Sequence, residues 1–148
     1  MKEIGIGVIG TAFMGKAHSI AYASAGTAFG GQLRPRLEMV CDQDPHIAET
    51  KRAEMGFARC TTDYMDVVND PKVDLISICV PNSVHKEIAI AALAAGKHVW
   101  CEKPMSTNLS DSQAMVDAAA ASDQKTIVGY NYIQNPLVHA ARDMINEG

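Results

Sequence analysis

Apolar and polar residues follow two different rhythms along this chain. Short runs that are almost continuously apolar are separated by longer segments in which apolar residues recur every three or four positions. Nearly continuous apolar runs are typical of strands that are covered on both faces in a parallel sheet. The runs predict strands at residues 4–10, 37–42, 73–80, 98–102 and 126–130, and a brief strand at residues 57–60.

The longer segments predict helices, because their apolar positions repeat with the period of an amphipathic helix. Helices are expected at residues 14–25, 45–55, 84–95, 109–121 and 136–146, with a short helix inside residues 61–71. Residues suited to end or begin a helix flank these segments. The expected C-terminal glycines are Gly26, Gly56, Gly96 and Gly148, and the expected N-caps are Ser83, Asn108 and Asn135. A strand followed by a helix throughout predicts an α/β fold with a doubly wound, mostly parallel sheet.

The first predicted strand runs into "GIGVIGTAFMG", which holds two overlapping glycine patterns. Gly5, Gly7 and Gly10 match G-x-G-x-x-G, whereas Gly10, Ala12 and Gly15 match it with alanine in the middle. A dinucleotide-binding loop must follow a strand and open a helix, since the helix N-terminus supplies amides and partial positive charge for the pyrophosphate. Only the second frame leaves a complete apolar strand before the loop. We therefore expect the loop there, and expect Gly5 and Gly7 to be small strand residues that let a helix pack closely.

An acidic residue ends the second predicted strand, where dinucleotide-binding folds hold the adenosine ribose. Asp42 follows Gly15 by 27 residues, more than the usual spacing of about 20. A surface loop predicted at residues 26–36, "GTAFGGQLRPR", would account for the excess. Because Asp42 would repel a 2′-phosphate and the next residue is an uncharged glutamine, NAD is favoured over NADP. The alternative is that Asp42 and Asp44 only cap the following helix.

Composition limits the classes of function. The chain has 148 residues, 47% of them hydrophobic, and a formal net charge of -4 with 13 basic residues. It is long enough for one domain, residues 1–148, and its scattered basic residues argue against a nucleic-acid partner. Without a run of about 20 apolar residues or a signal-peptide pattern, we expect no membrane partner and a cytoplasmic location. The cysteines have no metal-site or redox spacing, so buried free thiols and no metal are expected at Cys41, Cys60, Cys79 and Cys101.

Two further stretches narrow the function. Residues 79–106, "CVPNSVHKEIAIAALAAGKHVWCEKPMS", combine a strand ending in Pro-Asn-x-x-His with a second strand that runs into Glu-Lys-Pro. With "IGTAFMGKAH" near the N-terminus, this arrangement resembles the Gfo/Idh/MocA family of oxidoreductases, which act on sugars and cyclitols, over essentially the whole chain. The resemblance implies a nucleotide-binding Rossmann domain, with the family's second α+β domain absent from this chain.

The resemblance also implies where a cofactor would be bound. The glycine loop would contact the pyrophosphate and the acid after the second strand would hold the ribose. The Pro-Asn-x-x-His segment would line and brace the groove, the Glu-Lys-Pro segment would lie beside the nicotinamide ribose, and "GYNYIQNP" would reach the substrate mouth. The cofactor-binding residues implied are Gly10, Ala12, Phe13, Met14, Asp42, Val80, Pro81, Asn82, His85, Glu102, Lys103 and Asn131.

Lys103 is the implied catalytic residue, and the resemblance suggests a cis bond between it and Pro104. Oxidation of an alcohol removes the O–H proton while the C–H leaves as hydride, so a nearby lysine can relay the proton and stabilise the developing alkoxide. The alternative is a solvated Lys103 with Glu102 as its surface partner. His18, on the first predicted helix, is expected to be a packing or surface residue rather than a catalyst.

The resemblance implies an NAD-dependent dehydrogenase that oxidises a secondary hydroxyl of a sugar or cyclitol. This domain alone would be catalytically incomplete, and the longer protein would form a homo-oligomer through its second domain. Two alternatives remain at this point: a non-catalytic NAD-binding sensor, and a Rossmann reductase of another substrate class. An intact lysine at position 103 argues against the sensor, which needs no proton relay.

Overall fold

A single parallel sheet organises the computed structural model, which describes residues 2–148. Its six strands lie in the order β3-β2-β1-β4-β5-β6, and all five pairings are parallel. This is the order of a doubly wound dinucleotide-binding sheet, in which the chain reverses its direction of winding between β1 and β4. The strands are β1 (Lys2–Ile9), β2 (Leu33–Cys41), β3 (Arg59–Thr61), β4 (Leu75–Ile78), β5 (His98–Cys101) and β6 (Thr126–Val128).

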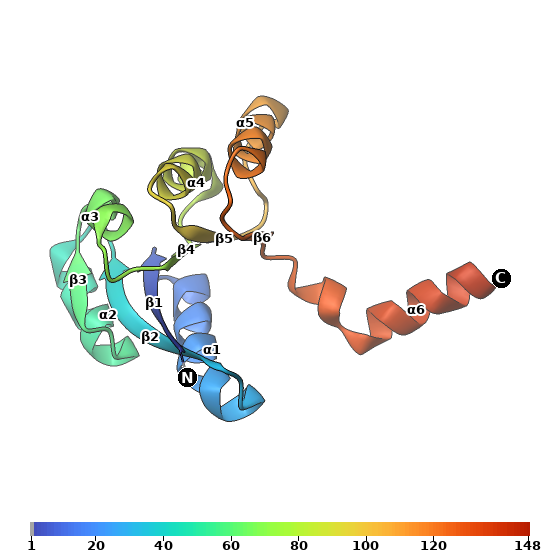
Figure 1. Ribbon diagram of the computed structural model, residues 1–148, viewed down its shortest axis with the longest axis horizontal. Helices are drawn as coiled ribbons and strands as arrows, with labels where there is room; N and C mark the ends of the chain where they lie inside the picture. Colours follow the sequence, from blue (N-terminus) through green and yellow to red (C-terminus); the bar gives the residue numbers. More distant parts are fainter. Residues whose placement is uncertain (1) are drawn as a thin grey trace.

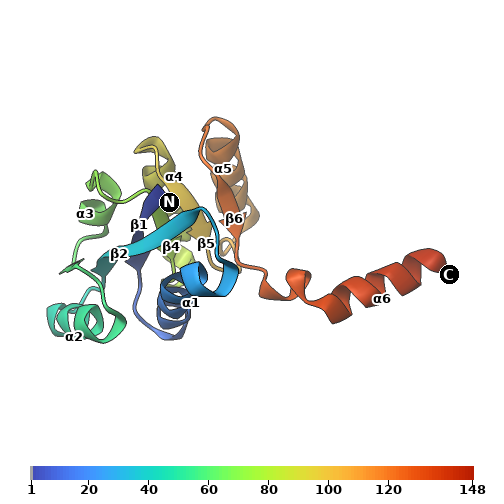
Figure 2. The same ribbon diagram turned by 60° about the horizontal axis from the view of Figure 1, so that its bottom comes forward.

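Helices cover both faces of the sheet (Figures 1 and 2). α1 and α2 lie on one face, whereas α3, α4 and α5 lie on the other, and α6 extends away from the sheet. Two short 3-10 turns, η1 and η2, precede α4 and α6. The helices are α1 (Phe13–Phe29), α2 (Pro45–Met55), α3 (Tyr64–Asn69), α4 (His85–Ala94), α5 (Leu109–Ala120) and α6 (Pro136–Glu147), and the turns are η1 (Asn82–Val84) and η2 (Asn131–Gln134).

The continuous apolar character of β1 follows from a core on each face of the sheet. Ile6 and Val8 belong to the core beneath α1 and α2, whereas Ile9 belongs to the larger core beneath α3, α4 and α5. Alternate side chains of a strand point to opposite faces, so a strand buried on both sides must be apolar at every position. Gly7 faces the larger core, where a Cβ would overlap Val67 of α3. The strands and helices predicted from the sequence are all present.

The predicted loop at residues 26–36 is wrong. α1 continues to Phe29 and β2 begins at Leu33, so the extra spacing is taken up by a longer helix and a longer strand. Gly26 lies inside α1, and Gly30, with φ 57°, ends the helix instead. A glycine inside a helix costs only about 1 kcal/mol relative to alanine, which the flanking helical residues can offset. Pro35 is tolerated in β2 because β3 pairs only with the end of that strand, so the missing N–H faces an open side.

The caps and C-terminal glycines are mostly as predicted. Asn108 and Asn135 accept hydrogen bonds from the first turns of α5 and α6. The glycines after α2, α4 and α6 have positive φ. Ser83 does not cap α4, because it lies within η1 and the helix begins only at His85. A 3-10 turn leading into a helix satisfies the first backbone groups without a side-chain cap.

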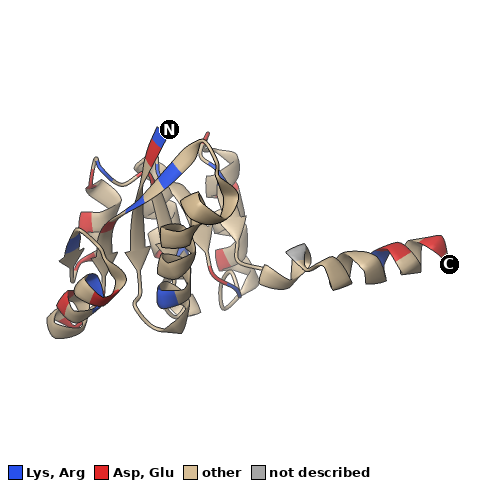
Figure 3. Ribbon diagram, turned by 90° about the horizontal axis from the view of Figure 1, so that it is seen from below, with Lys and Arg blue, Asp and Glu red and all other residues tan. Residues whose placement is uncertain are grey.

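Charged residues of both signs are spread over the helices (Figure 3). On α2, Lys51 pairs with Glu54 and Arg52 pairs with Glu49, each at 2.6 Å. On α6, Arg142 lies 2.7 Å from Asp143. No helix among residues 2–148 combines the length and the apolar character needed to cross a bilayer.

Gly5 and Gly26 give a matched test of the packing. A Cβ at Gly5 would overlap the backbone carbonyl of Lys72, whereas a Cβ at Gly26 would meet nothing within 4 Å. We expect Gly5→Ala to lower the free energy of unfolding by about 2 kcal/mol or more through overpacking, and Gly26→Ala to raise it by about 0.5–1 kcal/mol through helix propensity. Urea unfolding followed by circular dichroism measures both. Equal midpoints for Gly5→Ala and the unsubstituted chain would contradict the close approach.

Candidate functional site

Loops that follow the parallel strands meet at the carboxyl end of the sheet. In doubly wound sheets, ligands bind in the crevice outside this edge, at the point where the winding reverses. That point lies between β1 and β4 in this fold. Segments implied in cofactor binding follow five of the six strands: residues 10–12 after β1, Asp42 after β2, residues 80–82 after β4, residues 102–103 after β5 and Asn131 after β6.

The turn from β1 to α1 confirms the second glycine frame. β1 ends at Ile9 and α1 begins at Phe13, so the loop comprises residues 10–12. Gly10 has φ 96°, and a Cβ there would overlap the carbonyl of Cys79. A Cβ at Gly15 would overlap the carbonyl of Gly10. Both glycines are therefore required by close backbone contacts.

The other two glycines of "GIGVIG" are strand residues, as expected. Gly7 lies against the helix α3, as the prediction requires. Gly5 differs, since its close neighbour is the backbone of Lys72 in the loop between α3 and β4 rather than a helix. Its N–H donates to Oδ2 of Asp74 at 2.7 Å.

The N-terminus of α1 presents unpaired backbone N–H groups at the carboxyl edge of the sheet. Ala12 is the N-cap and has no side chain that can accept from the first turn. The first intrahelical bond runs from the N–H of Lys16 to the carbonyl of Ala12. The amides of residues 13–15 precede that bond, so they have no intrahelical acceptor. Exposed Phe13 and half-buried Met14 begin this turn. The free amides of the turn suit the binding of an anion.

A cavity of about 180 Å³, called the groove below, lies between this turn and the strand ends beside it. Its lining comes from the ends of β1, β2 and β4 and the loops after them. The lining residues are Ile9, Gly10, Thr11, Ala12, Cys41, Asp42, Gln43, Cys79, Val80 and Pro81. Of the residues expected at the pyrophosphate and the ribose, Gly10, Ala12 and Asp42 line this cavity, whereas Phe13 and Met14 do not.

Asp44 is the N-cap of α2, whereas Asp42 meets that helix end only through the N–H of Asp44, which lies 3.3 Å from Oδ1 of Asp42. The carboxylate of Asp44 caps α2, accepting from the N–H groups of His46 at 2.8 Å and Ile47 at 3.2 Å. Asp42 instead lines the cavity and accepts a hydrogen bond from the hydroxyl of Thr11. Thr11 was not singled out from the sequence, although its place between the two loop residues could have indicated it.

His85 supports the wall of the groove. It is 1% exposed, and its Nε2–H donates to the carbonyl of Val80 at 2.8 Å. Pro81 is exposed at the groove, and Asn82 begins η1. The hydrogen bond from His85 to Val80 fixes the chain where β4 ends, which is the supporting role that the family resemblance implies for His85.

The Glu-Lys-Pro segment separates its two charged residues. The peptide bond between Lys103 and Pro104 is cis, as the resemblance implies. Lys103 is exposed at the edge of the sheet. Glu102 is only 6% exposed, and its Oε1 accepts from Nε2 of His18 at 3.0 Å. Glu102 is therefore not the surface partner of Lys103, and one of its two oxygens is already engaged by His18.

A buried polar cluster behind this segment was missed from the sequence. His18 is 7% exposed, and its other ring nitrogen lies 3.1 Å from the hydroxyl of Ser77 in β4. His18 is therefore a packing residue of the interior, which is one of the two roles expected from the sequence, and not a surface residue. The burial of His18 could have been predicted from helical spacing, because Gly15, His18, Ser19 and Tyr22 share the face of α1 that packs on the sheet.

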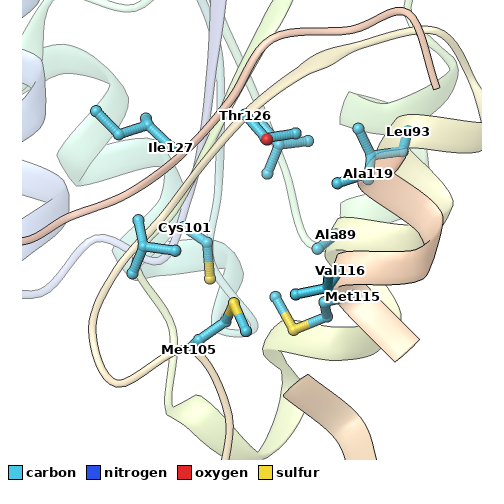
Figure 4. A pocket seen from close by; sticks show the side chains of 11 residues that line it. Ala89, Leu93, Cys101, Met105, Met115, Val116, Ala119, Thr126 and Ile127 are labelled. Carbon is cyan, nitrogen blue, oxygen red and sulfur yellow. The ribbon is translucent and has the colours of Figure 1, made fainter. Parts of the chain in front are cut away.

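A second cavity, of about 190 Å³, lies between α4, α5 and the strands β5 and β6 (Figure 4). It shares no lining residue with the groove. Its lining is apolar except for one threonine and contributes no charged group. The lining residues are Ala89, Leu93, Val99, Cys101, Met105, Met115, Val116, Ala119, Thr126, Ile127 and Val128.

The thiols are free, and Cys41, Cys79 and Cys101 are buried as expected, whereas Cys60 is only half-buried. Burial raises the pKa of Cys41, Cys79 and Cys101 to about 12, so these thiols stay protonated at neutral pH. Within residues 2–148 no three His, Cys, Asp or Glu side chains gather as they would around a metal ion.

Known proteins share this arrangement. Residues 4–130 match the model of the family described as "Oxidoreductase family, NAD-binding Rossmann fold". The levoglucosan dehydrogenase of Pseudarthrobacter phenanthrenivorans is 38% identical over 149 residues, which cover 100% of this chain and 38% of the relative. The myo-inositol 2-dehydrogenase of Thermotoga maritima is 29% identical over 126 residues, covering 85% and 36% of the two chains.

A solved structure agrees with these relatives. Levoglucosan dehydrogenase in complex with NADH and levoglucosan superposes with a TM-score of 0.93 at 36% identity, covering 99% of this chain and 40% of the other. The chain therefore spans about two fifths of the length of the relatives it matches. The family match, the strand order and the position of the glycine loop agree, and the chain belongs to the Gfo/Idh/MocA oxidoreductases with an NAD-binding Rossmann fold.

Proposed function

We propose that this chain is the cofactor-binding domain of an NAD-dependent dehydrogenase that oxidises a secondary hydroxyl of a sugar or cyclitol. The observation that carries the proposal is Lys103, exposed at the carboxyl edge of the sheet while Glu102 turns inward. A lysine with no carboxylate to neutralise it on the loop is available to a substrate hydroxyl. Relatives named for their substrates include a levoglucosan dehydrogenase, a myo-inositol 2-dehydrogenase and a 1,5-anhydro-D-fructose reductase.

The residues of the groove fit a dinucleotide. Unpaired amides in the first turn of α1 offer donors to the pyrophosphate, and the methyl group of Ala12 occupies the middle position of the loop. Asp42 lines the same cavity, where it can accept from the ribose hydroxyls. Val80 and Pro81 also line the cavity, and Asn82 follows them in η1, so we propose that this segment leads toward the nicotinamide.

Lys103 performs the acid-base part of the proposed reaction. When bound, the cofactor supplies the hydride acceptor at C4 of the nicotinamide. The amine of Lys103 takes the proton of the substrate hydroxyl, and the resulting ammonium stabilises the oxygen as the carbonyl forms. Asn131, exposed after β6, is proposed to lie at the substrate mouth.

We propose that the substrate itself is held by a further domain, and that the longer protein is a cytoplasmic homo-oligomer.

Replacement of Lys103 tests the proposed reaction. In the full-length polypeptide that carries this domain, Lys103→Met should lower kcat by about 100-fold or more, the contribution of one acid-base group. The affinity for NADH should fall by no more than about tenfold, because Lys103 contributes at most one contact to the cofactor besides its role as the proton relay. NADH production with a panel of sugars and cyclitols gives kcat, and NADH fluorescence titration gives the affinity. Turnover retained by Lys103→Met would show that the assigned role is wrong, and turnover by neither protein would favour the sensor.

The alanine in the glycine loop has a measurable cost. The middle residue of the loop is where the backbone approaches the pyrophosphate most closely, so the methyl of Ala12 should displace the diphosphate slightly. We expect Ala12→Gly to bind NADH about two- to fivefold more tightly, as expected when a contact worth up to about 1 kcal/mol is relieved. Titration of the 148-residue chain with NADH measures this. Unchanged or weaker binding would show that the methyl costs nothing.

Asp42 should set the preference between the two nicotinamide cofactors. Its carboxylate accepts from the ribose hydroxyls of NADH and repels the 2′-phosphate of NADPH. Asp42→Asn keeps an acceptor for Thr11 but removes the charge, so we expect NADH affinity to fall about tenfold and the preference for NADH over NADPH to narrow. Parallel titrations with the two cofactors measure the ratio. A preference unaffected by Asp42→Asn would place the ribose elsewhere.

A further inference from the structure

Four side chains from three different elements form a continuous hydrogen-bonded series in the interior. The hydroxyl of Tyr22 lies 2.8 Å from Oγ of Ser77, and Oγ of Ser77 lies 3.1 Å from Nδ1 of His18. Nε2 of His18 lies 3.0 Å from Oε1 of Glu102. Tyr22 and His18 come from α1, Ser77 from β4 and Glu102 from the end of β5. The series therefore joins the helix that opens at the pyrophosphate loop to the residue that precedes Lys103.

The carboxylate at one end of the series limits the direction of its hydrogen bond. Burial raises the pKa of Tyr22 to about 12, so its hydroxyl keeps its proton and can donate to Ser77. A carboxylate oxygen accepts, so the contact between His18 and Glu102 requires a proton on Nε2 of His18.

The space around Glu102 admits few other placements of its carboxylate. A Cβ at Gly129 would overlap Oε1 of Glu102, so the end of β6 passes directly over it. The backbone N–H of Glu102 donates to the carbonyl of Ile78 at 3.1 Å. The ring of Trp100 meets the His18 ring edge-on, with centroids 4.9 Å apart. His18 thus has a packed position from which its Nε2–H reaches the carboxylate.

We propose that His18 is a positioning residue: its hydrogen bond holds the carboxylate of Glu102 inside the domain and so sets the backbone that presents Lys103 at the nicotinamide end of the groove. The inference rests on the proposed function, since it concerns the same cofactor. α1 then acts at both ends of the dinucleotide, through its N-terminal amides at the pyrophosphate and through His18 at the Glu102–Lys103 segment.

Two amide substitutions that differ by one methylene test the role of His18. The amide of His18→Asn reaches about as far as Nδ1, so it can bond to Ser77 but not to Glu102. The amide of His18→Gln reaches the position of Nε2 and can still donate to Glu102. Both proteins are titrated with NADH and with ADP, which lacks the nicotinamide and its ribose. Thermal unfolding by circular dichroism confirms that each variant is folded.

The proposal expects a loss confined to the nicotinamide end. His18→Asn should bind NADH about fivefold more weakly or worse, the loss expected from about 1 kcal/mol at one weakened contact, and should bind ADP within about twofold of the unsubstituted chain. His18→Gln should recover most of the NADH affinity. Equal losses for the two ligands, or no loss for either, would overturn the positioning role. An unsubstituted chain that bound neither ligand would instead overturn the proposed function.

The tautomer of His18 provides a test that needs no variant. Long-range ¹⁵N–¹H spectra of the imidazole distinguish a proton on Nε2 from a proton on Nδ1. The proposal expects a proton on Nε2. A ring protonated only on Nδ1 would place no donor toward Glu102 and would overturn the inference even if His18→Asn did not fold.

Discussion

The close backbone contact between Gly10 and Gly15 is the constraint on which the rest of the site depends. A side chain at either position would overlap a carbonyl, of Cys79 in one case and of Gly10 in the other. Because glycine has no side chain, α1 can begin after a loop of only three residues and pack against the sheet. The amides of its first turn then lie at the point where the winding reverses. The same placement brings His18, one turn further along, beside Ser77 and Glu102.

Much of the architecture could be predicted because its causes are local. Strands buried on both faces must be apolar throughout, and that property can be recognised from each short run by itself. The errors arose where neighbours in space overruled a local signal. Gly26 was expected to end a helix that continues past it, and Pro35 was expected in a loop but lies in a strand whose outer side is open at that position. Neither the continuation of α1 past Gly26 nor the open side of β2 at Pro35 can be recognised from the flanking residues.

The two halves of the site differed in how predictable they were. Residues directly after strands could be assigned because parallel strands end at one edge, so Gly10, Asp42 and Val80 had to lie near one another. The interior partner of Glu102 could not be assigned in this way. His18 precedes Glu102 by more than eighty residues, and only the crossover from β1 to β4 and the pairing of β4 with β5 bring them together. Adjacent Glu and Lys in sequence instead suggest a surface ion pair.

The burial of Glu102 is difficult to explain by stability alone. Removing an ionised carboxylate from water costs several kcal/mol, and apolar replacements of buried polar pairs are often as stable or more stable. The fold meets part of that cost with the Nε2–H of His18, and it forgoes any side chain at Gly129 to make room. A buried acid is therefore held at a cost in packing and solvation, immediately before an exposed lysine. Such an arrangement is reasonable where the carboxylate sets the geometry of its neighbour, because an apolar residue could fill the same space but would provide no directional contact to fix the loop.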